Sequence, residues 1–220
     1  MRIRTPAGDL PFQCMAFPDG QRHVTLLSTD SGQFQQATIE AAIASANDLF
    51  DVLLLKNVLD VHNYVTCLNV RYLLGARMDR RIDSRSPFTL DVVARQLNGA
   101  GFRRVRVLDP HSQVACQLLS AEAVYPTGVV AEVFRRYLPS ETAVIVPDEG
   151  AITRVETLLR SVPEGDLYAP VQCHKDRDQR TGMLSGFRVD DASRVKGKTC
   201  LILDDLCDGG GTFLAIASQI

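Results

Sequence analysis

The fold of this chain is decided by one stretch, Cys200-Leu-Ile-Leu-Asp-Asp-Leu-Cys-Asp-Gly-Gly-Gly-Thr212, in which an apolar strand pattern runs into two carboxylates, a glycine turn and a helix start. The glycines allow backbone N–H groups to surround a phosphate, and Thr212 adds a hydroxyl. Asp204 and Asp205 would repel that phosphate unless they hold hydroxyl groups or a metal. A phosphorylated sugar supplies hydroxyls and a phosphate together. The alternative is a strand end followed by a glycine turn and two solvated acids.

The composition is that of a globular protein with one large or two small domains. The 220 residues are 45% hydrophobic and 23% charged, and the net charge of −2 argues against a general nucleic-acid binder. The 6 cysteines form no CxxC pair and no zinc-finger spacing, which predicts reduced thiols in a cytoplasmic protein. No apolar run approaches the ~18 residues of a membrane helix, so we expect no membrane segment.

Strand and helix patterns alternate along the chain, which predicts an α/β fold with parallel sheets. The run 39–45 is expected as a strand, although its alanines also suit a helix. Asn47 and Asp48 are expected to cap the next helix, and Pro87 to open another. The remaining expected strands are 65–71, 105–108, 142–146, 167–172 and 199–203, and the remaining expected helices are 128–138 and 151–161.

Titratable groups follow the expected strands, at the ends where ligands gather in open parallel sheets. They lie in Gly75–Arg81, Asp109-Pro-His111, Pro147-Asp-Glu-Gly150, His174-Lys-Asp-Arg177 and the opening stretch. Chance placement would seldom produce such a series, so we expect a binding site at these strand ends.

The order of these motifs resembles the ribose-phosphate diphosphokinases, which make phosphoribosyl pyrophosphate (PRPP) and AMP from ATP and ribose 5-phosphate. Phe17-Pro-Asp-Gly20 resembles the Phe-x-Asp-Gly-Glu segment of that family, and Ala76-Arg-Met-Asp-Arg-Arg81 resembles its Ala-Arg-Gln-Asp-Arg-Arg. Lys175-x-Arg177 looks like its flexible-loop lysine and arginine. Asp204–Thr212 alone would indicate only a phosphoribosyltransferase-like fold, and the arginine segment upstream narrows the resemblance.

The resemblance implies two phosphoribosyltransferase-like domains with parallel sheets flanked by helices. We expect a nucleotide-side domain over residues 1–125 and a partial ribose 5-phosphate-side domain over 126–220. Only eight residues follow Thr212, so we expect the second domain to be incomplete and the chain to be a fragment or a divergent member. The resemblance also implies a homo-oligomer whose adenine site is shared between subunits.

The resemblance assigns roles to individual residues. Lys175 and Arg177 would stabilise the transition state, since both can neutralise charge on phosphoryl oxygens; the alternative is a solvated loop of mixed charge. His111 and Asp148 would hold Mg²⁺. The nucleotide would contact Phe17, Asp19, Gln21, Arg77, Met78 and Asp79, with Asp79 orienting neighbouring arginines. Ribose 5-phosphate would contact Asp204, Asp205, Asp208, Gly209, Gly210, Gly211 and Thr212.

Several residues depart from the family pattern. Met78 replaces a glutamine and Gln21 a glutamate, while Gly209 replaces a threonine. Ala151 stands where a second glycine is usual, and we expect its methyl group to crowd the loop that approaches a phosphate. Two alternatives therefore stay open: a PRPP-dependent phosphoribosyltransferase and a non-catalytic regulatory or binding subunit.

Overall fold

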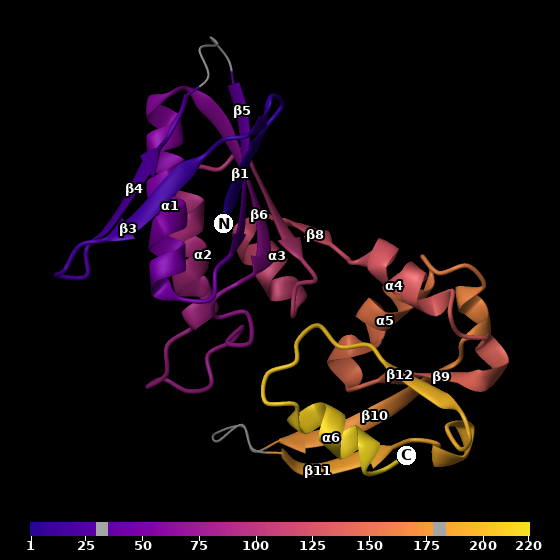
Figure 1. Ribbon diagram of the computed structural model, residues 1–220. Coiled ribbons are helices and arrows are strands. Elements are labelled where there is room, and N and C mark those ends of the chain that lie inside the picture. The colour runs from indigo at the N-terminus through magenta and orange to yellow at the C-terminus, as the bar shows by residue number, and fades with distance from the viewer. Residues whose placement is uncertain (30–34, 178–183) are drawn as a thin grey trace. The chain divides into compact units, whose positions relative to one another are not determined.

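A computed structural model describes residues 1–29, 35–177 and 184–220, which form two compact units, Met1–Val124 and Tyr125–Ile220 (Figure 1). The boundary expected from the sequence lay after residue 125. No helix in the described part of the chain is long and apolar enough to span a membrane.

The first unit is built on a 6-stranded sheet in the order β2-β1-β5-β6-β7-β8. Neighbouring strands from β5 to β8 are parallel, whereas β1 and β2 add an antiparallel edge. The strands are β1 (Arg2–Thr5), β2 (Gly8–Asp9), β5 (Gln35–Ala42), β6 (Tyr64–Tyr72), β7 (Arg104–Leu108) and β8 (Glu122–Val124).

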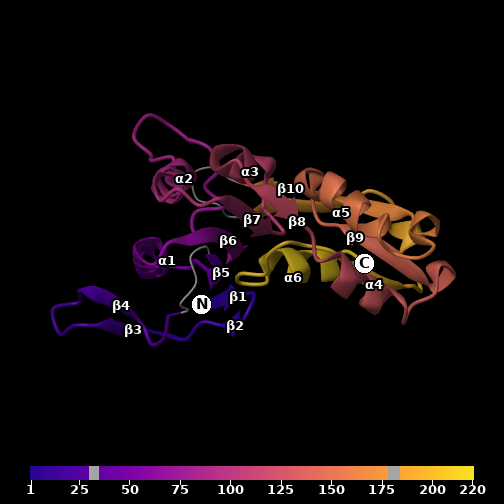
Figure 2. The same ribbon diagram turned by 90° about the horizontal axis from the view of Figure 1, so that it is seen from above.

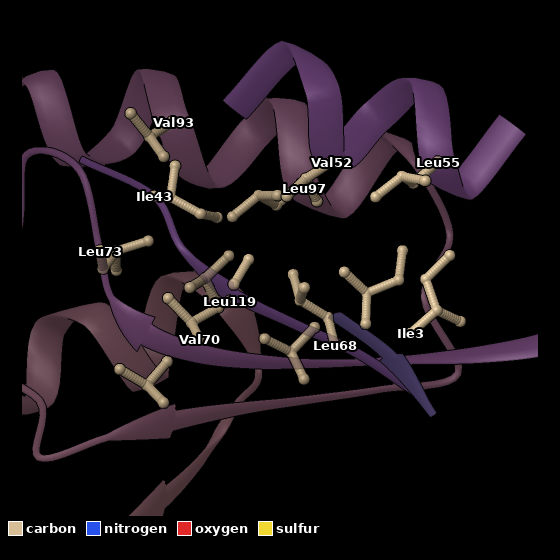
Figure 3. Packing of buried hydrophobic residues seen from close by; sticks show 14 of the residues in the cluster. Ile3, Ile43, Val52, Leu55, Leu68, Val70, Leu73, Val93, Leu97 and Leu119 are labelled. Carbon is tan, nitrogen blue, oxygen red and sulfur yellow. The ribbon is translucent and has the colours of Figure 1, made fainter. Parts of the chain in front are cut away.

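Apolar residues of α1 (Ala46–Val61) and α2 (Thr89–Gly99) pack against those of the central strands (Figure 3). Leu68 of β6 and Leu55 of α1 are both 0% exposed. The helix α3 (Gln113–Leu119) joins the same cluster, and the hairpin of β3 (Phe12–Ala16) and β4 (Arg22–Leu26) contacts α1 (Figure 2). Asp51 of α1 is 1% exposed and accepts a hydrogen bond of 2.9 Å from Nε of Arg22, which fastens the hairpin to the helix.

The second unit is built on a 4-stranded sheet in the order β11-β10-β9-β12. The strand β9 (Thr142–Val146) pairs in parallel with β10 (Pro170–Arg177) and β12 (Thr199–Ile202), and β11 (Leu184–Val189) is antiparallel to β10. The remaining elements are α4 (Thr127–Phe134), α5 (Ile152–Leu159), α6 (Gly211–Ala217) and the 3-10 turns η1 (Pro139–Glu141), η2 (Glu149–Ala151), η3 (Gly165–Leu167) and η4 (Ala192–Arg194).

Two separate apolar clusters cover the two faces of this second sheet. Val144 and Val146 belong to the cluster formed with α4 and α5. Ile145 belongs to the other cluster, together with Ile216 of α6. Because all of its residues are buried, β9 is the central support of the unit.

The structure confirms the mixed α/β class with parallel strands and corrects several details. The strand expected at 39–45 begins earlier and ends at Ala42, and α1 is capped by Ser45 instead of Asn47 and Asp48. Ser45 and Asp48 form a reciprocal capping box there. Pro87 precedes the cap of α2 rather than opening the helix. The expected helix at 128–138 ends at Phe134, and the one expected at 151–161 begins as a 3-10 turn.

Candidate functional site

Three of the segments expected to carry the site lie at the same edge of the second sheet. Ile145 of β9 pairs with Val171 of β10 and with Ile202 of β12, so these parallel strands end side by side. Asp148 and Asp204 follow β9 and β12, and His174 lies on β10 three residues beyond Val171. The structure therefore brings together strand ends that are far apart in the sequence.

The loop after β9 is ordered by Asp148. This residue caps η2, and its Oδ1 accepts a hydrogen bond of 3.1 Å from the backbone N–H of Ala151. A Cβ at Gly150 would lie 3.2 Å from the same oxygen, so glycine gives the carboxylate room. Ala151 is 8% exposed and packs in the core with α5. The crowding of a phosphate by its methyl group stays a prediction.

The stretch after β12 is an open turn leading into α6. Oδ1 of Asp204 accepts a hydrogen bond of 2.9 Å from the backbone N–H of Asp205. Gly210 has a φ of +75° and caps the helix, a left-handed conformation that favours glycine. A Cβ at Gly209 or Gly211 would meet no atom within 4 Å. Conformation therefore favours glycine at position 210 alone, and Asp208 beside it is exposed.

Arg154 is a residue of this site that the sequence analysis missed. Its Nη2 donates a hydrogen bond of 2.9 Å to the backbone carbonyl of Asp204, which joins α5 to the turn after β12. The only sequence signal is its spacing, because it follows Gly150 by one helical turn. A single guanidinium thus links the loop after β9 to the turn that carries Asp204 and Asp205.

His174 also holds loops together at this edge. Its Nε2 lies 2.8 Å from Oδ1 of Asp190, at the end of β11, and its Nδ1 lies 3.6 Å from Glu149. Arg188 approaches the same Asp190 oxygen at 3.4 Å. The imidazole therefore connects β10 to the loop after β9 and to the residue after β11.

Lys175 and Arg177 lie on β10, where their backbones pair with Phe187 and Leu184 of β11. The structure thus places both residues in a strand rather than in the loop that the sequence suggested. The rest of that predicted loop, 178–180, lies outside the described residues. The roles of the two side chains stay predictions.

In the first unit, the segments that carry Arg77 and His111 leave one edge of the sheet. Val70 of β6 pairs with Val107 of β7, so both strands end there. Arg77 and Met78 are exposed, and a turn at Gly75, with a φ of +76°, orders the segment. The orienting role of Asp79 stays a prediction.

Phe17, Asp19 and Gln21 form the tip of the β3–β4 hairpin. Asp19 accepts hydrogen bonds from the backbone N–H of Gln21 at 3.1 Å and from its side chain at 2.7 Å. Phe17 is 45% exposed. These residues lie on an element separate from Arg77, and the tip has polar and aromatic groups available for a ligand.

The described residues contain no group of three or more His, Cys, Asp or Glu side chains arranged to hold a metal. Mg²⁺ is commonly bound by one or two carboxylates together with substrate phosphates and water. Asp148 supplies an oxygen donor of this kind, and exposed His111 precedes α3 in the other unit. The carboxylate of Asp148 is thus a donor of the kind that Mg²⁺ prefers, and the assignment of His111 and Asp148 as its ligands stays a prediction.

The chain is similar to ribose-phosphate pyrophosphokinases in sequence. The protein of that name from Marinomonas sp. is 28% identical over 187 residues, which are 83% of this chain and 58% of that protein. Ribose-phosphate pyrophosphokinase A from Dictyostelium discoideum is 29% identical over 147 residues, covering 66% of this chain and 44% of that protein. The chain thus spans roughly half the length of these relatives. No protein-family model matches it.

The fold is similar to that of phosphoribosylpyrophosphate synthetase from Mycobacterium smegmatis. The TM-score is 0.75 at 21% identity, and the match covers 95% of this chain and 67% of that chain. At this identity the match shows a shared fold, including the two parallel-stranded sheets.

Proposed function

We propose the function of this chain from the ribose-phosphate pyrophosphokinase family, to which its sequence and fold relate it. The chain transfers the pyrophosphoryl group of ATP to the C1 hydroxyl of ribose 5-phosphate, giving PRPP and AMP. The observation that carries the proposal is the meeting of the Asp148 loop, β10 and the Asp204–Thr212 turn at one edge of the second sheet.

Ribose 5-phosphate binds at the turn after β12 in this proposal. Asp204 and Asp205 accept hydrogen bonds from the sugar hydroxyls, while the glycine turn and Thr212 bind the 5-phosphate. Arg154 holds the Asp204 backbone at 2.9 Å, so the carboxylates start from a fixed position. Such positioning of the attacking hydroxyl is a large part of catalysis in phosphoryl transfer.

ATP occupies the donor side. Arg77 binds the nucleotide or its phosphates, with Met78 and Asp79 beside it. Phe17, Asp19 and Gln21 bind adenine from an adjacent subunit, which makes the active form a homo-oligomer. The exposed hairpin tip supports this arrangement, since Phe17 is 45% exposed in the single chain. The proposal includes a cytoplasmic location, because the cysteines of the sequence form no CxxC pair and are expected as reduced thiols.

The C1 hydroxyl oxygen attacks the β-phosphorus of ATP, the bond from that phosphorus to the oxygen of the α-phosphate breaks, and the hydroxyl proton is released. Lys175 and Arg177 neutralise the charge that builds on the transferred group. Asp148 and His111 would hold Mg²⁺, which supplies charge neutralisation on the ATP oxygens.

The test is to incubate the chain with ATP, Mg²⁺ and ribose 5-phosphate and to measure PRPP and AMP together. Lys175→Ala and Arg177→Ala should each lower kcat by about a hundredfold or more, as for other charge-stabilising contacts, while ribose 5-phosphate still binds. Lys196→Ala removes an exposed lysine of the same unit and should leave kcat unchanged. Equal formation of PRPP by Lys175→Ala and the wild type would refute the role of Lys175.

If the assay yields neither PRPP nor AMP while ribose 5-phosphate binds, the chain is a non-catalytic binding subunit. A second assay, in which the chain is given PRPP and a nucleobase, tests the other alternative: consumption of PRPP there would make the chain a phosphoribosyltransferase. The arginine segment at 77–81 favours the diphosphokinase, because a phosphoribosyltransferase has no use for it.

A further inference from the structure

Several ion pairs lie on one face of the first sheet. Residues of β5, β6 and β7 alternate between the buried core and an exposed or half-buried face. On that second face Arg4 and Arg71 both pair with Glu40, and Arg106 pairs with Glu122 at 2.9 Å. The contact with Arg106 lowers the pKa of Glu122, so this carboxylate stays charged. These arginines are therefore neutralised within the protein.

A hollow of about 410 Å³ lies where the strands of this face begin. Its volume is within the range of small-molecule sites. It is lined by Gln36, Ala37, Thr38, Val65, Cys67, Arg103 and Arg104. Arg77 and His111 follow the opposite ends of the same strands, so the hollow is separate from the candidate nucleotide residues.

Arg103 and Arg104 differ from the other arginines of the face. In the described part of the chain, neither forms an ion pair with a carboxylate. The backbone N–H of Arg103 donates a hydrogen bond of 2.9 Å to the carbonyl of Thr66, which fixes the entry into β7. Arg104 lies near enough to Glu122 to help lower the pKa of that carboxylate, but Glu122 is already paired with Arg106. Two adjacent arginines thus border the hollow without a direct ion pair of their own.

The lining has the chemistry of a site for a small organic anion. A guanidinium group binds a phosphate or a carboxylate through two parallel hydrogen bonds. Gln36 and Thr38 add a side-chain amide and a hydroxyl, which can bind further oxygens. Val65, which is 43% exposed, offers an apolar surface to the rest of the ligand. Oxyanion and apolar contacts are therefore available in one hollow.

We propose that this hollow binds a small organic anion, whose phosphate or carboxylate group lies between Arg103 and Arg104 and whose apolar part covers Val65. The site is independent of the proposed pyrophosphoryl transfer, because none of its residues belongs to the substrate sites named above.

Cys67 provides a readout specific to the hollow. We would measure the rate at which iodoacetamide alkylates each cysteine, by mass spectrometry of its peptide, with phenyl phosphate, benzoate or neutral benzyl alcohol present. At about ten times its Kd a bound probe should slow Cys67 alkylation about tenfold. Cys207 is exposed in the other unit and serves as the internal control.

The double variant Arg103→Gln/Arg104→Gln should lose this protection. Arg2→Gln removes an arginine from the same sheet, outside the hollow, and should keep it. Protection by phenyl phosphate alone identifies a phosphate site, and protection by benzoate alone identifies a carboxylate site. Protection by benzyl alcohol as strong as by either anion would overturn the proposal, as would full protection in the double variant.

Titration calorimetry with the same probes gives a second measurement that does not depend on the thiol. For a given probe, phenyl phosphate or benzoate, the wild type and Arg2→Gln should have equal affinity. The double variant should bind that probe at least about tenfold more weakly, because both guanidinium groups are lost. Equal affinity of all three proteins would refute an anion site between these arginines, whatever the outcome of the PRPP assay.

Discussion

Replacing Gly165 by alanine should destabilise the second unit strongly. Gly165 is buried at the start of η3, where the chain turns back on the last residue of α5. An added Cβ would lie 1.9 Å from the carbonyl oxygen of Leu159 and 2.8 Å from its carbonyl carbon. These are backbone atoms, which cannot rotate away as the end of a flexible side chain would.

The expected loss of stability follows from the distance between the added Cβ and the Leu159 carbonyl. An ordinary contact needs more than 3 Å, so the turn must shift by over an ångström. Overpacking of this kind costs about 1–3 kcal/mol, and we expect about 3 because the clash is with backbone. Such a loss is a large part of the 5–15 kcal/mol by which a domain is typically stable. The shift would also displace β10, which follows η3 and carries His174.

Gly128 provides the matched control for the same substitution. It lies in α4, and a Cβ there would meet no atom within 4 Å. Gly128→Ala should therefore stabilise the protein by about 0.5 kcal/mol, because alanine loses less backbone entropy on folding. Urea denaturation of both variants and the wild type tests the pair. A Gly165→Ala midpoint equal to that of the wild type would refute the close packing of η3 against α5.

Three further substitutions or reactions test other parts of the structure. Arg22→Met leaves the buried Asp51 carboxylate unpaired and should speed amide exchange in the β3–β4 hairpin, whereas Arg22→Met/Asp51→Leu should slow it again; unchanged exchange in the single variant would contradict this. Ser45→Ala should lower the unfolding free energy by about 1 kcal/mol at pH 7. The bond that the Ser45 hydroxyl donates to the carboxylate lowers the pKa of Asp48, so the part of the deficit due to this bond should be lost as the pH falls through that lowered pKa. The part due to the bond from the Asp48 backbone N–H should remain, and a deficit that does not change with pH would count against the bond to the carboxylate. Burial raises the pKa of Cys173 to about 11, so iodoacetamide at pH 8 should modify Cys207 much faster than Cys173, and similar rates for both thiols would refute this burial.

The sequence predicted the elements whose pattern comes from burial. The expected strand 142–146 coincides with β9, because a continuous apolar run marks a strand buried on both faces. The helix α1 was found from its apolar positions, although its cap was misplaced by two to three residues. The cap depends on a reciprocal bond between Ser45 and Asp48, which the polar run Ser45–Asp48 does not locate uniquely.

The sequence did not predict the antiparallel additions. The strands β1 to β4 are short and mostly exposed or half-buried, so their residues alternate weakly and give little signal. The strand β11 was not predicted, because Lys175 and Arg177 before it indicated a loop. Antiparallel pairing with β10 is a long-range contact that a local pattern does not specify.

Local sequence patterns could not predict the hydrogen bonds and ion pairs within the candidate site either. Arg154 and Asp204 are 50 residues apart, and only the parallel pairing of β9 with β12 brings them together. His174 depends in the same way on the hairpin that brings Asp190 beside it. The motifs predicted which loops carry polar groups, whereas the contacts that orient these groups required the fold.

The position of Asp204 depends on the central strand in two ways. The strand before it, β12, lies at the edge of the sheet and is exposed or half-buried along its length, so burial alone holds β12 less firmly than β9. The pairing with β9 supplies the first constraint. Arg154 supplies the second, because α5 packs through Val155 and Leu158 on the cluster that contains Val144 of β9. A guanidinium on a helix that packs against the buried strand thus fixes the backbone just beyond the edge strand, which explains how the turn after β12 can present carboxylates in a defined position.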